Sequence, residues 1–337
     1  MSGHSPEEDV KASVLCVISA SPQRIESRIV HAVADAIGDE RNVEIVRLYR
    51  KPLSILPRLW RAARNCDILI VHSPFLLSIG AIVIGRLLRR KIIGLLWDDY
   101  PVFISGRRYD NSIRRRLFDW IENWGIDHIK LLLVPSPDFR SVEKYQDTVF
   151  CPFWCRSPST ISLPQPERVK GAQICILFAG QVNRTRGLEN ALALLSKITD
   201  GDFVLRIAAP DCPGATILEH PNVQYLGHLT QGELALEAQK YDAGLISLHP
   251  NFDGVGFPSK TFDYLSWNLP LLFAGRTYPW MTGLAEQIGI GIDGNTISKL
   301  YLSDLTDLRT DFAGKRKCFE RRTCLDVDAL KSVLEKS

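Results

Sequence analysis

Short runs of strongly apolar residues alternate with amphipathic stretches along most of the chain, and this alternation limits the possible folds most strongly. In the first half, the runs VLCVIS at 14–19, DILIV at 67–71 and KIIGLL at 91–96 have the length and composition of buried strands. In 24–37, apolar residues recur every three to four positions, as on one face of a helix. Alternating strands and helices form parallel sheets covered by helices on both faces. The sequence therefore predicts an α/β fold.

The alternation stops once and then resumes. Residues 156–170, RSPSTISLPQPERVK, contain three prolines and no periodicity, which indicates a linker. We therefore expect a domain over 1–155, the linker over 156–170, a second domain over 171–300, and C-terminal helices over 301–337 that cross back to the first domain. Both domains are predicted to be doubly wound and Rossmann-like, facing a cleft, with ligands beyond the carboxyl ends of their strands. The expected elements are strands at 14–19, 43–48, 67–71, 91–96, 130–134, 174–179, 203–208, 223–226, 243–248 and 270–273, and helices at 24–37, 53–64, 75–88, 112–124, 188–198, 231–239 and 259–267.

Several features bear on where a chain like this works. The first residues, MSGHSPEEDVK, lack the basic start and apolar run of a secretory signal. The longest uncharged apolar run, 74–85, is too short to span a bilayer. The eight cysteines show no paired metal-ligand spacing, which is typical of free thiols in a reducing compartment. We therefore expect a cytoplasmic protein without a metal site, either free or peripheral on the inner face of the cytoplasmic membrane.

The segment 241–271 carries the clearest chemistry. A buried strand enters a glycine-rich loop that contains Gly256, and the loop leads into a helix through Pro258 and Ser259. Proline suits the first helical turn, and the serine side chain is expected to cap it. Backbone amides at a helix start, together with the helix dipole, hold phosphate groups. We therefore predict an anion-binding helix start.

Two charged residues follow in the first turn of this expected helix. Lys260 opposes the helix dipole, which is easiest to explain if the ammonium group meets an anion. Asp263 lies three residues later, close to the same face, and a carboxylate is a good partner for paired ribose hydroxyls. The alternative interpretation is a solvated Lys–Asp pair on the helix surface.

This segment resembles a known family. GFPSKTFDYLSWNLPLLF, residues 256–273, is similar to the donor-binding motif of retaining glycosyltransferases of family four, in the GT-B fold class. The resemblance implies that Asp263 binds the nucleotide ribose. The family's earlier acidic position falls on Val255 here, and Asp253, two residues away, is the candidate replacement. The donor contacts implied on this side are Gly256, Phe257, Pro258, Ser259, Lys260 and Asp263.

A second segment, LFAGQVNRTRGLENALAL at 177–194, matches the same family. In the family a strand is followed by Gly, a basic residue and then Lys-Gly, whose cations bind the donor diphosphate. Here Gly180 opens the loop, Gln181 stands at the arginine position and Arg186 at the lysine position, with Arg184 nearby. An arginine can clamp a phosphate with two hydrogen bonds. The alternative is a surface turn with two solvated arginines.

Two carboxylates close the strand in LLWDDYP, residues 95–101. Asp98 or Asp99 is a candidate for positioning an acceptor hydroxyl, and in an inverting enzyme one of them would be the general base. The alternative is a turn in which the aspartate side chains bind backbone amides. The single His72 at the end of another strand is interpreted as structural.

Positive charge is concentrated between Arg86 and Arg116. This stretch contains nine Lys and Arg residues against three Asp, with aromatic residues between them. Such a pattern favours an anionic membrane surface; the alternative is a solvated arginine face over a core-packed aromatic stripe. Nucleic acid is not expected, because no recognition motif accompanies the charge and the isoelectric point is about 8.4.

The resemblance implies transfer of a sugar from a UDP- or GDP-linked donor to an acceptor hydroxyl. As the resemblance also implies, the reaction would be retaining and would belong to polysaccharide or lipid-linked glycan synthesis. No metal is expected, because the sequence shows no DxD-type site. The N-terminal domain would bind the acceptor and the C-terminal domain the donor. Two alternatives stay open: an inverting GT-B transferase, and a non-catalytic partner subunit that binds a sugar nucleotide. The expected catalytic residues are Asp98, Asp99, Arg186 and Lys260.

Overall fold

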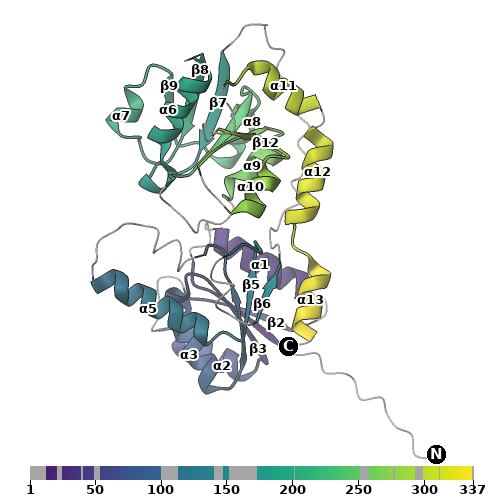
Figure 1. The fold of residues 1–337 in the computed structure, drawn as a ribbon. Coiled ribbons are helices and arrows are strands. Elements are labelled where there is room, and N and C mark those ends of the chain that lie inside the picture. Colours follow the sequence, from purple (N-terminus) through teal and green to yellow (C-terminus); the bar gives the residue numbers. More distant parts are fainter. Residues whose placement is uncertain are drawn as a thin grey trace, which may run out of the picture. The chain divides into compact units, whose positions relative to one another are not determined.

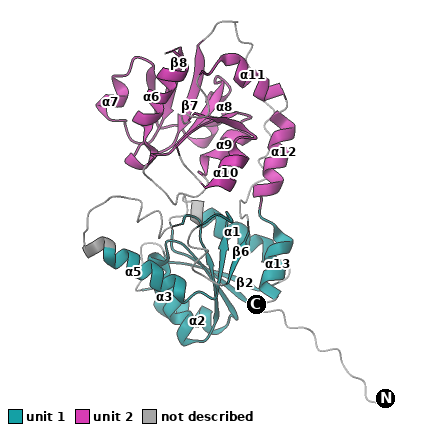
Figure 2. Ribbon diagram, in the orientation of Figure 1, with its two compact units in different colours: residues 1–101, 109–155, 325–337 teal, residues 102–108, 156–324 magenta. Residues whose placement is uncertain are grey.

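The structure, a computed structural model, separates into two compact units. The first contains residues 1–101, 109–155 and 325–337, and the second contains 102–108 and 156–324 (Figure 2). The linker expected at 156–170 lies outside the described residues, and the predicted domain boundaries stay a prediction. The described residues are 13–20, 25–38, 41–48, 54–99, 113–139, 147–151, 173–200, 202–250, 258–275, 278–292, 299–310 and 312–335.

The first unit is built on a parallel sheet with strand order β2-β1-β3-β4-β5-β6. Its strands β1, β3 and β4 are almost wholly buried, as their continuous apolar runs predict. Its described elements are β1 (Val14–Ile18), α1 (Ile25–Gly38), β2 (Val43–Arg47), α2 (Leu56–Arg64), β3 (Ile68–His72), the 3₁₀-helix η1 (Phe75–Ser78), α3 (Ile79–Leu87), β4 (Lys91–Leu95), α5 (Ile113–Asp127), β5 (Leu131–Val134), β6 (Thr148–Phe150) and α13 (Val327–Glu335).

The last helix belongs to the first unit although it ends the described chain. Helix α13 packs beside α1 (Figure 1), and its Leu330 and Leu334 are buried. The C-terminal segment therefore adds apolar side chains to the core of the unit in which the chain begins.

The second unit has the strand order β12-β11-β10-β7-β8-β9, again all parallel. Its core consists of apolar residues from β7, β8, β10 and β11 packed against α6. Its described elements are β7 (Ile174–Ala179), the 3₁₀-helix η3 (Arg184–Arg186), α6 (Leu188–Ile198), β8 (Phe203–Ala208), α7 (Ala215–Leu218), β9 (Val223–Gly227), α8 (Gln231–Ala238), β10 (Ala243–Ser247), α9 (Lys260–Ser266), β11 (Leu271–Ala274), α10 (Pro279–Ala285), β12 (Gly289–Gly291), α11 (Leu302–Thr310) and α12 (Phe312–Thr323).

The topology confirms the predicted α/β fold with two doubly wound sheets. Most expected elements lie within three residues of the observed bounds, and α6 and β8 match at both ends. The sequence did not predict α7, α10, β6 or β12, each of only three to seven residues, too short for a periodic signal. The expected helix at 75–88 is divided into η1 and α3. The cleft expected between the domains stays a prediction.

Candidate functional site

The strand order of the second sheet reverses between β7 and β10, although all of its strands are parallel. From β7 the chain passes through α6 to β8, and from β10 through α9 to β11 on the other side. The register aligns Ala179 with Ala208 and Ser247 with Ala274, so the strands end at one edge. In open parallel sheets, ligands bind at such a switch point, outside the carboxyl ends of the strands. The two predicted motifs lie on either side of it.

The loop after β7 is held against the end of β10. Gly187 adopts a left-handed conformation with φ 53°, and a Cβ there would lie 2.7 Å from the Cα of His249. His249 N donates to Thr185 O over 2.9 Å, and Ser247 Oγ donates to Arg186 O. Only glycine fits this close approach without strain. The backbone of Arg186 therefore lies at the switch point, immediately before α6.

Both arginines of this loop lie in η3. Asn183 caps η3, because its Oδ1 accepts from Thr185 N over 3.0 Å. Arg184 is exposed and Arg186 is half-buried. Helix α6 then starts directly after Gly187 and runs for 11 residues. The chain therefore carries two arginines immediately before the start of α6, where the helix dipole and the free backbone amides favour an anion.

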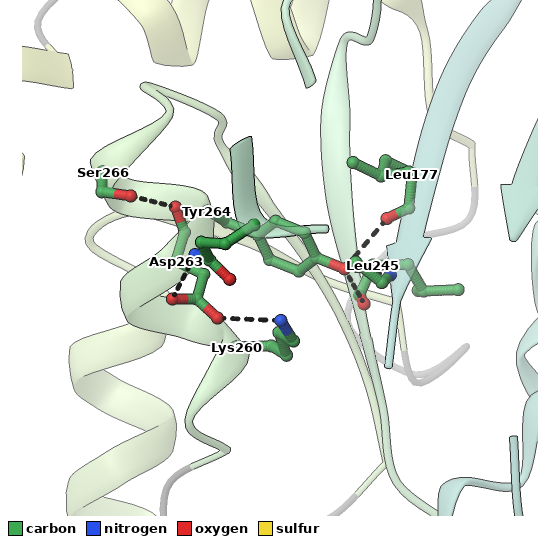
Figure 3. Close-up of polar contacts among 8 residues, drawn as sticks. Leu177, Leu245, Lys260, Asp263, Tyr264 and Ser266 are labelled. Atoms are coloured by element: carbon green, nitrogen blue, oxygen red, sulfur yellow. Dashed lines mark hydrogen bonds and ion pairs between the residues drawn. The ribbon is translucent and has the colours of Figure 1, made fainter. Parts of the chain in front are cut away.

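Tyr264 connects α9 to the strands on both sides of the switch point. Its hydroxyl accepts from Ala179 N over 2.7 Å and lies 3.2 Å from Leu177 O and 3.3 Å from Leu245 O (Figure 3). A Cβ on Gly244 would lie 2.5 Å from the tyrosine ring, so the phenol crosses β10 where no side chain stands. Burial raises the pKa of the Tyr264 hydroxyl, which keeps it protonated. This residue fixes the position of α9.

Lys260 and Asp263 form an ion pair on α9. Lys260 Nζ lies 2.9 Å from Asp263 Oδ2, and Gln231 Nε2 donates to Asp263 Oδ1 over 3.2 Å. The Asp263 side chain is only 12% exposed, against 31% for Lys260. The pair is therefore not fully solvated, and its carboxylate is oriented from two directions. Gln231, at the start of α8, was missed because no local pattern connects it to α9.

One detail expected at this helix start is wrong. Ser259 has helical dihedral angles, φ −58° and ψ −27°, and its side chain makes no capping hydrogen bond. A capping side chain needs an extended backbone to reach the amides of the next turn. Pro258 precedes α9, which begins at Lys260. Gly256 and Phe257, with Asp253 and Val255, lie outside the described residues.

The aspartates of LLWDDYP follow β4 in the first unit. Leu96 N donates to Leu133 O over 2.9 Å, and Trp97 N donates to Ser73 Oγ over 3.1 Å, which holds the strand end in place. Asp99 is fully buried, whereas Asp98 is half-buried. Of the two carboxylates, Asp98 is the one that solvent reaches.

His72 is structural, in agreement with its interpretation from the sequence. Its Nε2 accepts from Ser19 N over 3.0 Å, so the proton is assigned to Nδ1, which donates to Ser73 O over 2.7 Å. The ring is buried and joins the ends of β1 and β3. Both ring nitrogens are occupied by backbone groups.

A buried carboxylate that the sequence did not single out lies in the same unit. Glu122 of α5 accepts from Phe75 N over 2.9 Å and from Leu76 N over 2.6 Å, at the start of η1. Burial raises the pKa of Glu122 to about 7, although the two amide donors act in the opposite direction. No sequence signal marks it, because its partners lie 46 and 47 positions away.

No protein-family model matches the chain. A curated relative, the probable glycosyltransferase WbjE of Pseudomonas aeruginosa, is 22% identical over 251 residues. The match covers 68% of this chain and 62% of that relative, so the chain spans under two thirds of its length. This chain is therefore similar in sequence to a protein that is named as a probable glycosyltransferase.

Solved structures share the fold. The lipopolysaccharide outer core galactosyltransferase WaaB has a TM-score of 0.56 at 12% identity, covering 92% of this chain and 98% of that one. A kitacinnamycin glycosyltransferase reaches 0.52 at 13% identity, covering 96% and 98%. A Listeria monocytogenes structure assigned as a UDP-N-acetylglucosamine 2-epimerase reaches 0.51 at 11% identity, covering 96% and 95%. The fold is therefore the predicted GT-B fold, which solved structures named as transferases and as an epimerase share.

Replacing Tyr264 with phenylalanine tests the connection across the switch point. The substitution leaves Ala179 N without its acceptor inside the core, and an unsatisfied buried donor costs about 1–3 kcal/mol. We expect urea unfolding to show a loss of stability in that range. Tyr301→Phe, at an exposed tyrosine, is the matched control and should unfold like the unmodified chain. Equal stability of both variants would show that the Tyr264 hydroxyl does not hold α9.

Glu122 predicts a pH dependence of stability. The folded state holds a proton that the unfolded chain releases above the ordinary pKa of 4.5, so the unfolding free energy falls as pH rises from 4.5 to about 7. Glu122→Gln removes the titrating group and should flatten this fall, measured by urea unfolding across the pH range. Glu286→Gln, at an exposed glutamate, should retain the slope. The same slope in Glu122→Gln as in the unmodified chain would contradict the assignment.

Proposed function

We propose that this chain is a glycosyltransferase that moves a sugar from a nucleotide diphosphate-sugar to an acceptor hydroxyl. The observation that carries the proposal is the pair of motifs beside the β7/β10 switch point. One supplies Arg184 and Arg186 before α6, and the other supplies Lys260 and Asp263 on α9. The relatives named glycosyltransferases support the same activity.

In this proposal the donor diphosphate lies at the start of α6. Arg184 and Arg186 bind its oxygens, and the amides that follow Gly187 add hydrogen bonds along the helix dipole. Gly180 at the end of β7 keeps the approach to the backbone open, because a Cβ there would meet nothing within 4 Å. A doubly charged diphosphate is the ligand that this combination of cations and amides fits.

Asp263 binds the ribose of the donor. Its two oxygens already accept from Gln231 and Lys260, and each carboxylate oxygen retains a second acceptor position for a hydroxyl. Lys260 is the more exposed partner, so its ammonium group can contact a phosphate while it stays beside Asp263. Gly256, Phe257, Pro258 and Ser259 complete the donor side, with the first two proposed from the sequence alone.

The chemistry follows from the charge that develops as the sugar leaves. Negative charge accumulates on the departing diphosphate, and Arg186 and Lys260 stabilise it where it forms. We propose a retaining reaction that needs no metal, with UDP or GDP as the leaving nucleotide. Among the described residues, no three His, Cys, Asp or Glu side chains gather as metal ligands would. Activity that survives EDTA, and a product with the anomeric configuration of the donor by NMR, are the expected results.

The first unit takes the acceptor in this proposal. Asp98, half-buried after β4, positions the acceptor hydroxyl, and buried Asp99 supports the turn beside it. The acceptor class we propose is a glycan or lipid-linked sugar at the inner face of the cytoplasmic membrane, in polysaccharide or lipid-linked glycan synthesis. In the part of the chain that the structure describes, no helix is both long and apolar enough to cross a membrane.

Removing single cations tests the donor site. Arg186→Ala and Lys260→Ala should each weaken binding of UDP or GDP by about 10- to 100-fold, the range of one charge-assisted hydrogen bond. Isothermal titration calorimetry with both nucleotides measures this directly. Lys197→Ala, at an exposed lysine in the last turn of α6, controls for a general loss of positive charge. Unchanged affinity in both site variants would overturn the donor site.

Asp98→Asn separates acceptor positioning from donor binding. The substitution keeps the shape but removes the charge, so we expect nucleotide release in the presence of acceptor extract to fall about 10- to 100-fold. Nucleotide affinity should stay unchanged by calorimetry. Normal turnover in the Asp98→Asn variant would show that LLWDDYP serves only as a structural turn.

A further inference from the structure

Exposed apolar side chains gather on one part of the first unit. Ten large apolar side chains are exposed among the described residues, and six of them lie on α2, η1, α3 and α5. Leu87 and Trp120 are the most exposed of these six, at 67% and 62%. These six, defined here as the apolar set, are Trp60, Leu77, Val83, Leu87, Leu117 and Trp120.

The four elements that carry the apolar set pack beside one another. Helix α2 lies against α3 (Figure 1). Helix α5 lies against η1. The approach of α5 is close, because a Cβ on Gly125 would lie 2.9 Å from the Cβ of Phe75. The hydrogen bonds from η1 to Glu122 fasten the same contact. The apolar set is therefore distributed over a continuous helical layer.

Arginines share the exposed helix faces with this set. On α3, Val83, Arg86 and Leu87 follow one face at spacings of three and four. On α5, Arg116, Leu117 and Trp120 do the same. Helices α2 and α3 and the 3₁₀-helix η1 contain no Asp or Glu. Helix α5 contains Asp119, Glu122 and Asp127 as well as its arginines, so the positive excess of the layer is concentrated on α2 and α3.

Helix α2 adds cations that the sequence interpretation did not include. Arg61 and Arg64 are exposed beside Trp60 on its outer face. By contrast, Arg90, within the predicted basic stretch, donates to Ala63 O over 3.1 Å and to Arg64 O over 2.6 Å, so it fixes the end of α2. The cations of the layer therefore coincide only in part with those of the 86–116 stretch, because Arg86 and Arg116 belong to both, Arg61 and Arg64 belong only to the layer, and Arg90 is bonded to the end of α2.

We propose that this layer of α2, η1, α3 and α5 docks on an anionic lipid bilayer. Exposed tryptophan and leucine among arginines are the groups that enter the bilayer interface, where Trp rings lie at headgroup level and arginines meet anionic headgroups. Side chains spread over several helices fit a broad surface better than a single peptide. The proposal rests on the proposed function only for the lipid-linked acceptor, since lipid binding does not require the donor site.

Vesicle sedimentation of the full chain tests this proposal. The unmodified chain should bind phosphatidylcholine vesicles that contain phosphatidylglycerol and should bind pure phosphatidylcholine far more weakly. Arg61→Glu/Arg86→Glu should reduce binding at least about fivefold for each arginine reversed. Leu87→Glu should reduce it as well, because the substitution places a carboxylate where an apolar side chain enters the interface. Absence of binding to the anionic vesicles would overturn the proposal.

Matched variants in the second unit control for charge and hydrophobicity. Leu236→Glu replaces a leucine that is 66% exposed on α8, close to the 67% of Leu87, and Arg322→Glu replaces an exposed arginine on α12. Both should bind vesicles like the unmodified chain, and circular dichroism should show that every variant is folded. Equal losses in the control and layer variants would overturn the proposal. So would a layer variant that abolishes self-association in analytical ultracentrifugation while vesicle binding persists, because the layer would then bind a second copy.

The donor site gives an independent readout. Leu87→Glu should leave nucleotide affinity unchanged by calorimetry, and Lys260→Ala should leave vesicle binding unchanged. Loss of nucleotide binding with intact vesicle binding would refute the donor site alone. If the unmodified chain binds nucleotide but does not bind the anionic vesicles, the membrane surface alone is refuted.

Discussion

The hydroxyl of Tyr264 is the contact on which the geometry of the second unit depends. It lies within hydrogen-bond distance of one amide and two carbonyls on β7 and β10. The strand order of the sheet reverses between these two strands. Since β10 carries Gly244 beneath the ring, the phenol reaches β7 without displacing a side chain. The Tyr264 contacts therefore position α9, with its Lys260–Asp263 ion pair, against β7, which lies on the opposite side of β10 from β11.

A second close approach fixes the opposite loop. Gly187 allows the chain after β7 to contact His249 after β10, and hydrogen bonds from Ser247 and His249 to backbone carbonyls fasten it there. The Tyr264 hydroxyl and the contacts around Gly187 both bind backbone groups. The positions of the segments that carry the charged groups therefore follow from packing and backbone geometry.

The sequence predicted the fold well because long apolar runs and helical periodicity are local signals. Elements such as α6 and β8 show their full pattern within their own residues. Strand β6, with three residues at the sheet edge, owes its conformation to pairing with β5, which no local pattern encodes. The same reason explains the functional residues that were missed. Gln231 and Glu122 act on partners more than 30 positions away, so only the folded chain reveals them.

The two units show why similar architectures do not have one function. Each is a parallel sheet of alternating strands and helices, and the chemistry lies in what the edges and outer faces carry. In the second unit, cations follow the strand ends at a switch point, where a small anion can be enclosed. In the first, cations are interspersed with exposed apolar side chains along helix faces. A charge count along the sequence cannot distinguish these cases, because Arg90 and Arg86 are near neighbours in the chain, and only Arg90 is bonded to the end of α2. What matters for recognition is which charges remain at a surface and which groups surround them there.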